Sequence, residues 1–135
     1  MSSVSDKASL VSVVDDDESV RESVPDMLRV LGFVAEAFPS AEAFLASEFV
    51  SETRCLVLDV VMPGMSGPDL ESELIRRRQR IPIVFITGHG GGSVTSRLLE
   101  RGAIECLVKP FSEVALLDAV RTALGWSSSG PVTAT

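Results

Sequence analysis

Cysteine and histidine are scarce in this chain of 135 residues, which has two cysteines and one histidine. Cys55 and Cys106 each lie inside an apolar run, so both are expected to be small core residues in a reducing compartment, without a disulfide. His89 has no other histidine or cysteine at metal-ligand spacing, and no serine or cysteine placed to use it as a base. Zinc chemistry and serine or cysteine catalysis are therefore disfavoured.

Long apolar runs are also absent. No run approaches the roughly 18 residues that a membrane span needs, and the polar stretch from Met1 to Lys7 lacks the charged-then-apolar order of a secretion signal. We therefore expect a cytoplasmic protein without membrane contact. Positive charge is in deficit, with 12 Lys and Arg against 19 Asp and Glu, and the net charge of −7 disfavours direct nucleic-acid binding.

What the chain does contain is a regular alternation of apolar segments and helical patterns, which predicts one α/β domain with a parallel sheet and helices on both faces. The expected strands are 10–14, 33–38, 55–59, 81–87 and 103–108; the expected helices are 19–31, 41–49, 68–78, 93–101 and 113–124. Residues 1–8 are expected to form a disordered arm, residues 9–125 the domain, and the Ser/Gly/Pro/Thr-rich residues 126–135 a linker or tail.

Helix ends and buried faces follow from the same patterns. Serines at 40, 93 and 112 are expected to cap helices, and Gly32 and Gly102 to end them. Pro25 conflicts with the helix around it and predicts a local kink or an irregular first turn. The side chains expected to face inward include Phe44, Leu45, Leu70, Leu74, Ile75, Val114, Leu117, Val120 and Leu124.

Polar residues collect where the expected strands end. Asp15 and Asp16 follow the first strand, Asp59 ends the third, Thr87 the fourth, and Lys109 follows the fifth. Right-handed crossovers bring the carboxyl ends of parallel strands to one edge. Each residue has a plainer interpretation, since Asp59 can simply cap its strand and the run 15–18 can be a solvated acidic loop.

Brought together, these side chains suit phosphoryl transfer. Carboxylate oxygens are ligands for Mg²⁺, and a carboxylate can attack phosphorus to give an aspartyl phosphate. We assign the attack to Asp59 and the metal to Asp16, with Asp15 in support. Lys109 would pair with the phosphoryl group, and the Thr87 hydroxyl would sense it.

In this pattern the chain resembles the receiver domain of two-component response regulators, most closely the receivers of nitrogen-fixation and nodulation transcription regulators. The resemblance covers residues 10–124 and rests on four motifs at strand ends: Val13–Asp16, Leu58–Pro63 with Ser66-Gly67, Ile86–Gly90 and Lys109–Phe111. It implies a doubly wound, flavodoxin-like (βα)5 fold with a five-stranded parallel sheet in the order 2-1-3-4-5.

The resemblance also implies functional roles. Asp59 is the phosphoacceptor, fed by a sensor histidine kinase in a two-component phosphorelay. Asp16, Asp59 and the backbone carbonyl of Val61 hold Mg²⁺, while Thr87 and Lys109 bind the phosphoryl group. Phosphorylation then switches the conformation and controls an output domain, expected to act in transcription, or a partner. Such a protein is no enzyme beyond its own phosphorylation and dephosphorylation.

Two positions depart from the family pattern or remain without an assigned role. Many family members carry Tyr or Phe three residues before the lysine, but here Cys106 occupies that position and cannot swing a large ring. His89 is expected in an exposed loop near the site mouth, where it can tune water attack on the phosphoaspartate. The glycine-rich loop 88–92 favours a large displacement of the helix after it.

Three rival functions stay open. In Asp-nucleophile phosphohydrolases a second acid stands two residues after the nucleophile, but here Val61 cannot donate a proton, which favours a long-lived phosphoryl mark. A flavin or nucleotide module would need a glycine-rich loop after the first strand. A phosphorylation-independent interaction domain would retain the fold without the chemistry.

Partner contacts in the family use the face formed by helix 4, strand 5 and helix 5. Here that face would present Arg97, Arg101 and Glu105, so homodimer pairing through complementary charges is an expectation. Receivers of this resemblance usually precede a DNA-binding domain, and the composition of residues 126–135 is that of an interdomain linker, so a receiver cut from a longer protein is the favoured interpretation.

Overall fold

The computed structural model describes residues 9–88 and 92–128. Its centre is a parallel sheet in the order β2-β1-β3-β4-β5, as the resemblance implied. The strands are β1 (Leu10–Val14), β2 (Val34–Phe38), β3 (Thr53–Asp59), β4 (Ile83–Thr87) and β5 (Glu105–Val108). The described helices are α1 (Glu18–Val30), α2 (Ala41–Ala46), the 3-10 turn η2 (Val50–Glu52), α3 (Gly67–Arg76), α4 (Gly92–Glu100) and α5 (Glu113–Ser128). The doubly wound, flavodoxin-like fold is thereby confirmed.

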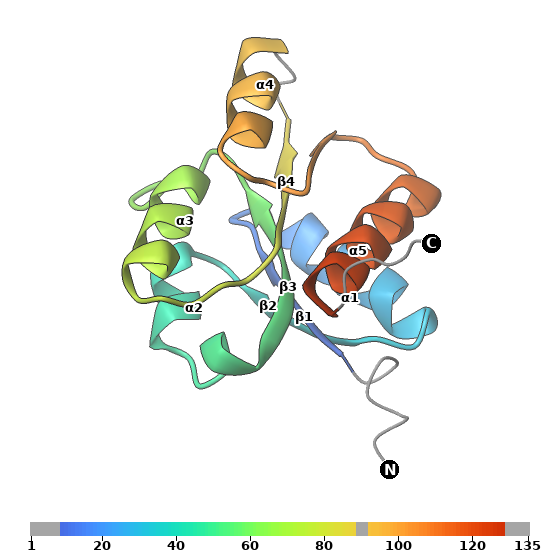
Figure 1. The fold of residues 1–135 in the computed structure, drawn as a ribbon. Coiled ribbons are helices and arrows are strands. Elements are labelled where there is room, and N and C mark those ends of the chain that lie inside the picture. The colour runs from blue at the N-terminus through green and yellow to red at the C-terminus, as the bar shows by residue number, and fades with distance from the viewer. Residues whose placement is uncertain (1–8, 89–91, 129–135) are drawn as a thin grey trace.

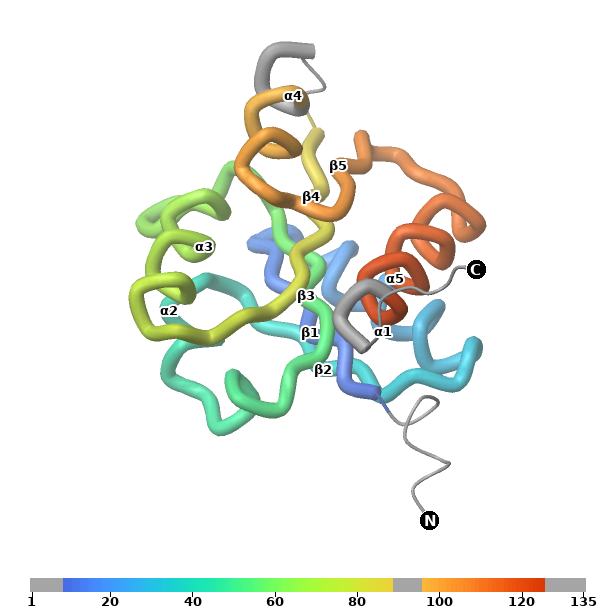
Figure 2. Tube along the Cα trace, in the orientation of Figure 1, coloured from blue at the N-terminus to red at the C-terminus, as the bar shows by residue number. Residues whose placement is uncertain are grey.

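Helices cover both faces of the sheet, with α1 and α5 on one side and α2 and α3 on the other (Figures 1 and 2). Each face has its own apolar core. Val24 and Leu28 of α1 and Leu116 and Val120 of α5 pack on the first face. The second core joins α2, α3 and α4 and includes Phe44, Leu70, Leu74 and Leu98. Between them, β1 and β4 are buried along their whole length, which explains their near-continuous apolar sequence. The edge strands β2 and β5 are partly exposed.

The serine caps were predicted with partial success. Ser40 Oγ accepts from the backbone N–H of Ala43 at 3.0 Å, and Ser112 Oγ accepts from that of Ala115 at 3.0 Å, so both caps are confirmed. The cap predicted at Ser93 is wrong, because α4 already begins at Gly92. Ser66, which lies outside the helix predicted over 68–78, caps α3 in a capping box with Asp69.

Two inward-facing predictions are wrong. Ile75 is 64% exposed, because the buried stripe of α3 runs through Gly67, Leu70, Glu71 and Leu74 instead. Val114 is 67% exposed, because the buried stripe of α5 starts two residues later, at Leu116. Leu117 and Leu124 are half-buried, whereas Phe44, Leu70, Leu74 and Val120 are buried as expected.

The ends of several elements moved from their predicted places. α2 stops at Ala46, and the chain makes η2 where the helix was expected to run to residue 49. α5 continues to Ser128, past the residue at which the domain was expected to end. α1 passes through Pro25 as one helix, with the proline buried.

The two cysteines are buried thiols, as the apolar runs around them indicated. Burial raises the pKa of the Cys55 thiol to about 12, which keeps it protonated and unreactive. Within residues 9–88 and 92–128, no helix has the length and apolar character to cross a bilayer.

Candidate functional site

Four strands deliver polar side chains to one rim of the sheet. Asp15 lies just after β1, Asp59 is the last residue of β3, Thr87 the last of β4, and Lys109 follows β5. Strand register keeps these ends level, because Asp59 pairs with Ile86 and Thr87 pairs with Val108. The convergence predicted from the sequence is therefore present in the fold.

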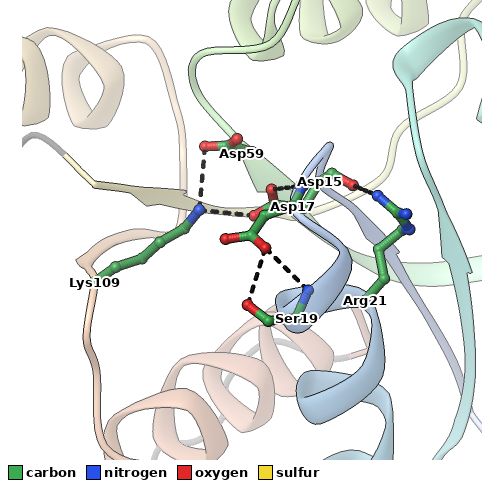
Figure 3. A network of polar contacts seen from close by, with 6 residues as sticks. All are labelled: Asp15, Asp17, Ser19, Arg21, Asp59 and Lys109. Atoms are coloured by element: carbon green, nitrogen blue, oxygen red, sulfur yellow. Dashed lines mark hydrogen bonds and ion pairs between the residues drawn. The ribbon is translucent and has the colours of Figure 1, made fainter.

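The centre of the rim is Lys109 between two buried carboxylates (Figure 3). Its Nζ lies 2.9 Å from Oδ2 of Asp15 and 3.8 Å from Oδ1 of Asp59. The Asp15 side chain is fully buried and that of Asp59 is 7% exposed, while that of Lys109 is 23% exposed. Two anions so close together in a poorly solvated place need a cation, and Lys109 supplies one positive charge. The backbone N–H of Lys109 also donates to the Thr87 carbonyl at 2.8 Å.

In the acidic run after β1, Asp15 is buried, whereas Asp16, Asp17 and Glu18 are exposed. Oδ1 of Asp15 accepts from the backbone N–H of Asp17 at 2.9 Å, and Arg21 donates to the Asp15 carbonyl at 3.0 Å. Asp17 caps α1 by accepting from the backbone N–H and the hydroxyl of Ser19, each at 2.9 Å (Figure 3). Sequence reasoning missed Asp17 and Arg21. The signal for Asp17 was present, since an acid directly before Glu18 and a helical pattern is typical of an N-cap.

Behind Asp59 the chain packs tightly. Gly67 lies so close that a Cβ there would overlap the backbone oxygen of Asp59, and its N–H donates to the carbonyl of Val60 at 3.0 Å. Glu42 of α2 accepts from the backbone N–H of Met65 at 3.1 Å, which ties the loop after β3 to the neighbouring helix. The end of β3 is thereby held from two sides.

Electrostatics at the rim favour a proton or another cation near Asp59. Burial, then repulsion from Asp15, raises the pKa of Asp59 from 3.8 to about 7, although Lys109 and a backbone hydrogen bond with Val61 act in the opposite direction. Burial lowers the pKa of Lys109, but its close contact with Asp15 and its attraction to the three aspartates 15, 59 and 17 leave that pKa above the ordinary value.

The rim is suited to a divalent cation. Carboxylate oxygens of Asp15, Asp16 and Asp59 all lie within 4.8 Å of one another. Oδ2 of Asp15 is buried and accepts no hydrogen bond of good geometry from the described residues, although Lys109 is beside it. A hard cation with oxygen ligands would relieve the repulsion that raises the pKa of Asp59. The donor set therefore fits Mg²⁺.

Comparison with protein families matches residues 11–121 to the response regulator receiver domain. This chain belongs to the response regulator receiver family. Among relatives, the receiver is 48% identical over 111 residues to nodulation protein W of Bradyrhizobium diazoefficiens, covering 82% of this chain and 49% of that protein. It is 41% identical over 121 residues to the response regulator TodT of Pseudomonas putida, covering 90% of this chain and 53% of that protein. The chain thus spans about half the length of these relatives.

Solved structures agree with the family. The crystal structure of FixJ-N superposes on the receiver with a TM-score of 0.77 at 36% identity, covering 91% of this chain and 97% of that one. The structure of the response regulator StyR gives a TM-score of 0.78 at 51% identity, covering 85% of this chain and 58% of that one. The similarity to nodulation and nitrogen-fixation regulators inferred from the motifs is confirmed.

The remaining residues singled out in the receiver occupy different environments. Asp16 is exposed at the rim, Thr87 is buried, and the Val61 side chain is 65% exposed. Cys106 is buried on β5, where it pairs in register with Phe85 of β4, so it has a core environment. His89 lies outside the described residues.

Proposed function

We propose that this receiver accepts a phosphoryl group on Asp59 from a sensor histidine kinase and changes conformation as a result. The observation that carries the proposal is the position of Lys109, whose ammonium group lies between the buried carboxylates of Asp15 and Asp59. An ammonium group this close to the Asp59 oxygen is also close to any phosphoryl group attached to that oxygen.

In the proposed reaction, a carboxylate oxygen of Asp59 attacks the phosphorus of a phosphohistidine. The new O–P bond forms as the P–N bond breaks, and the departing imidazole nitrogen keeps the bonding electrons and takes up a proton. Attack requires the ionised carboxylate, so the proton that the raised Asp59 pKa retains has to be displaced first. Lys109 and the Thr87 hydroxyl then bind phosphoryl oxygens, the first as a cation and the second as a hydrogen-bond donor.

Asp16, Asp59 and the backbone carbonyl of Val61 would hold Mg²⁺, with Asp15 in support. The closeness of the three carboxylates supports this set. Bound there, the ion would neutralise negative charge on the phosphoryl oxygens. Lys109 would keep the phosphoryl group oriented, and the buried position of Asp59 would limit access of water to the acyl phosphate.

The lifetime of the phosphoryl group would depend on residues at the mouth of the site. Val61 is exposed two residues after Asp59 and has no acidic proton to donate, which supports a slow loss of phosphate. His89 would tune the same step by ordering water. These assignments distinguish the proposed receiver from an Asp-nucleophile phosphohydrolase, for which phosphate release would be rapid and repeated.

Downstream, the receiver would control an output domain or partner in the cytoplasm. The relatives include proteins named transcriptional regulatory proteins, of which this chain matches about half the length, which supports a transcriptional output. The response would pass through the face formed by α4, β5 and α5. Arg97 and Glu105 are exposed on it, while Arg101 contacts α3.

The direct test is incubation with acetyl phosphate and Mg²⁺, followed by intact-mass measurement. The wild-type chain should gain one phosphoryl group, and Asp59→Asn should gain none. Asp118→Asn on the exposed side of α5 is the matched control and should react like the wild type. An unmodified wild-type chain would favour a phosphorylation-independent interaction domain, and continuous phosphate release would favour the phosphohydrolase.

A further inference from the structure

A cavity of about 790 Å³ lies at the end of the molecule opposite the phosphoryl rim. It is bounded by the carboxyl end of α3, the chain entering β4 and the turn after α4. Ile83, which lines it, is four residues before Thr87 and therefore roughly 13 Å from the rim along the strand. The volume falls within the range of about 300–1,000 Å³ that small-molecule sites occupy. No role described so far uses this cavity.

Its inner wall contains a buried acid that the sequence did not predict. Glu71 of α3 is 5% exposed among apolar neighbours that include Leu74 and Ile83. Its Oε1 is 3.3 Å from Nη2 of Arg101 and accepts no hydrogen bond of good geometry from the described residues. Burial raises the pKa of Glu71 and Arg101 partly offsets this rise. An incompletely satisfied buried oxygen is costly, and a hydrogen-bond donor in the cavity would satisfy it.

The lining of the cavity also carries cationic side chains. Arg78 and Arg80 both line it, and within the part of the chain that the structure describes neither side chain has a hydrogen bond or ion pair. With Arg101, the lining has three guanidinium groups against one carboxylate, in a chain whose net charge is −7. A local excess of positive charge in an acidic protein attracts anions to that place.

The walls between these charges are apolar and held by the backbone. Leu74 and Ile83 are buried, and Ile75 and Ile81 complete the apolar surface. The turn between α3 and β4 is closed by two hydrogen bonds, from the N–H of Arg78 to Ile75 and from that of Gln79 to Leu74, each at 2.9 Å. A binding site whose backbone is already held by hydrogen bonds loses little conformational entropy when a ligand binds.

We propose that this cavity is a second ligand site, for a small organic anion with an apolar body and a hydrogen-bond donor. The carboxylate of such a molecule meets Arg78 and Arg80, its body lies against the isoleucines, and its donor reaches Oε1 of Glu71. Because Arg101 follows α4 and contacts Glu71 and Ser72 of α3, the ligand also contacts the link between these two helices.

The test is an NMR titration of the isotopically labelled 135-residue chain with 4-hydroxyphenylacetate. Two comparison probes each remove one feature: phenylacetate lacks the hydroxyl donor, and 4-hydroxyphenylacetamide lacks the charge. The amide signals of Gln79, Ile83 and Gly102 should move, with those of Asp59 and Lys109 unchanged. 4-Hydroxyphenylacetate should bind most tightly, by about tenfold over either comparison probe.

Variants assign the contacts. The double variant Arg78→Gln/Arg80→Gln should weaken binding of 4-hydroxyphenylacetate about tenfold, whereas Arg121→Gln on the exposed side of α5 should leave it unchanged. Glu71→Gln should reduce the advantage of the hydroxylated probe over phenylacetate, with thermal unfolding confirming that the variant is folded. Equal binding of all three probes, signal changes confined to the phosphoryl rim, or equal affinities in the double variant and Arg121→Gln would each overturn the proposal.

Discussion

Asp59 is the residue at which burial and charge oppose one another most directly. Its folded-state pKa of about 7 stands above the ordinary value of 3.8, so the folded chain binds a proton there more tightly than the unfolded chain. The stabilising effect of that proton is complete below pH 3.8 and is lost as the pH rises through 7. Above neutral pH the Asp59 carboxylate loses this proton, and its buried charge then destabilises the folded protein.

Asp59→Asn should remove this loss of stability. We expect the variant to be more stable than the wild type at pH 8, and the gap to shrink at pH 5, with a change between the two on the order of 2 kcal/mol. Urea unfolding of both proteins at the two pH values, without divalent cations, measures it. Asp118→Asn provides the baseline, and a gap independent of pH would show that the raised pKa is not a property of the folded protein.

Gly67 is the second residue on which the site depends, because it allows α3 to begin directly against the end of β3. Gly67→Ala should destabilise the fold by about 1–3 kcal/mol, since a Cβ overlaps the backbone of Asp59 and contacts the Phe85 ring at 3.1 Å. Gly125→Ala in α5 is the matched control, because nothing lies within 4 Å of its added Cβ. Chemical unfolding of the two variants compares them, and equal stabilities would mean that the backbone has room to move.

At the scale of the element, α3 begins with a reciprocal pair of capping hydrogen bonds. Ser66 Oγ accepts from the N–H of Asp69 at 3.2 Å, and the Asp69 carboxylate accepts from the N–H of Ser66 at 3.2 Å. Ser66→Ala should lower the unfolding free energy by about 1 kcal/mol, because it leaves an N-terminal amide without its acceptor. Ser96→Ala, at an exposed position within α4, should be close to neutral in the same thermal unfolding experiment. An equal loss of unfolding free energy in both variants would show that the cap is not the cause of the loss.

The sequence predicted the positions of the helices and strands better than it predicted which side of each helix is buried. Five apolar runs separated by helical periods leave few folds other than a parallel α/β sheet, and strand ends then locate Asp15, Asp59, Thr87 and Lys109. Which side of a helix is buried depends on neighbours distant in sequence. Glu71 is buried because Arg101, thirty residues later, comes close enough to pair with it, and no local pattern in α3 contains that information. Ile75 is exposed because a helix can bury only one stripe of residues, and in α3 that stripe contains Glu71 and Leu74.

At the scale of the whole molecule, three of the seven large apolar side chains that are exposed among the described residues lie on the face proposed for pairing. Leu99 of α4, Val108 of β5 and Val114 of α5 are 41%, 45% and 67% exposed. They lie on the same three elements that the family resemblance assigned to pairing. Apolar contact would contribute more to association than the exposed charges there, because exposed ion pairs are worth only about 0–1 kcal/mol each.

We therefore expect dimerisation to depend on this face. The wild-type chain should be a monomer alone and a dimer with beryllium fluoride and Mg²⁺, as measured by light scattering during gel filtration. Val114→Asp should weaken the dimer at least about tenfold without changing the monomer. Val30→Asp is the control, because Val30 is 80% exposed on α1, which is not one of the three elements of the proposed face. Loss of the dimer in both variants would point to another interface.

The position of Lys109 has a mechanical consequence. β5 is an edge strand of the sheet and pairs with β4 alone, yet the side chain of the residue after it, Lys109, contacts Asp15 beside β1. The Lys109 ammonium group therefore links the edge strand β5 to the ends of the inner strands β1 and β3. Under the proposed function, that group would turn toward a newly attached phosphate, and the ion pair between Lys109 and Asp15 would weaken. Phosphorylation would thus make the edge strand β5 less firmly attached to the rest of the sheet, because Lys109 would move away from Asp15.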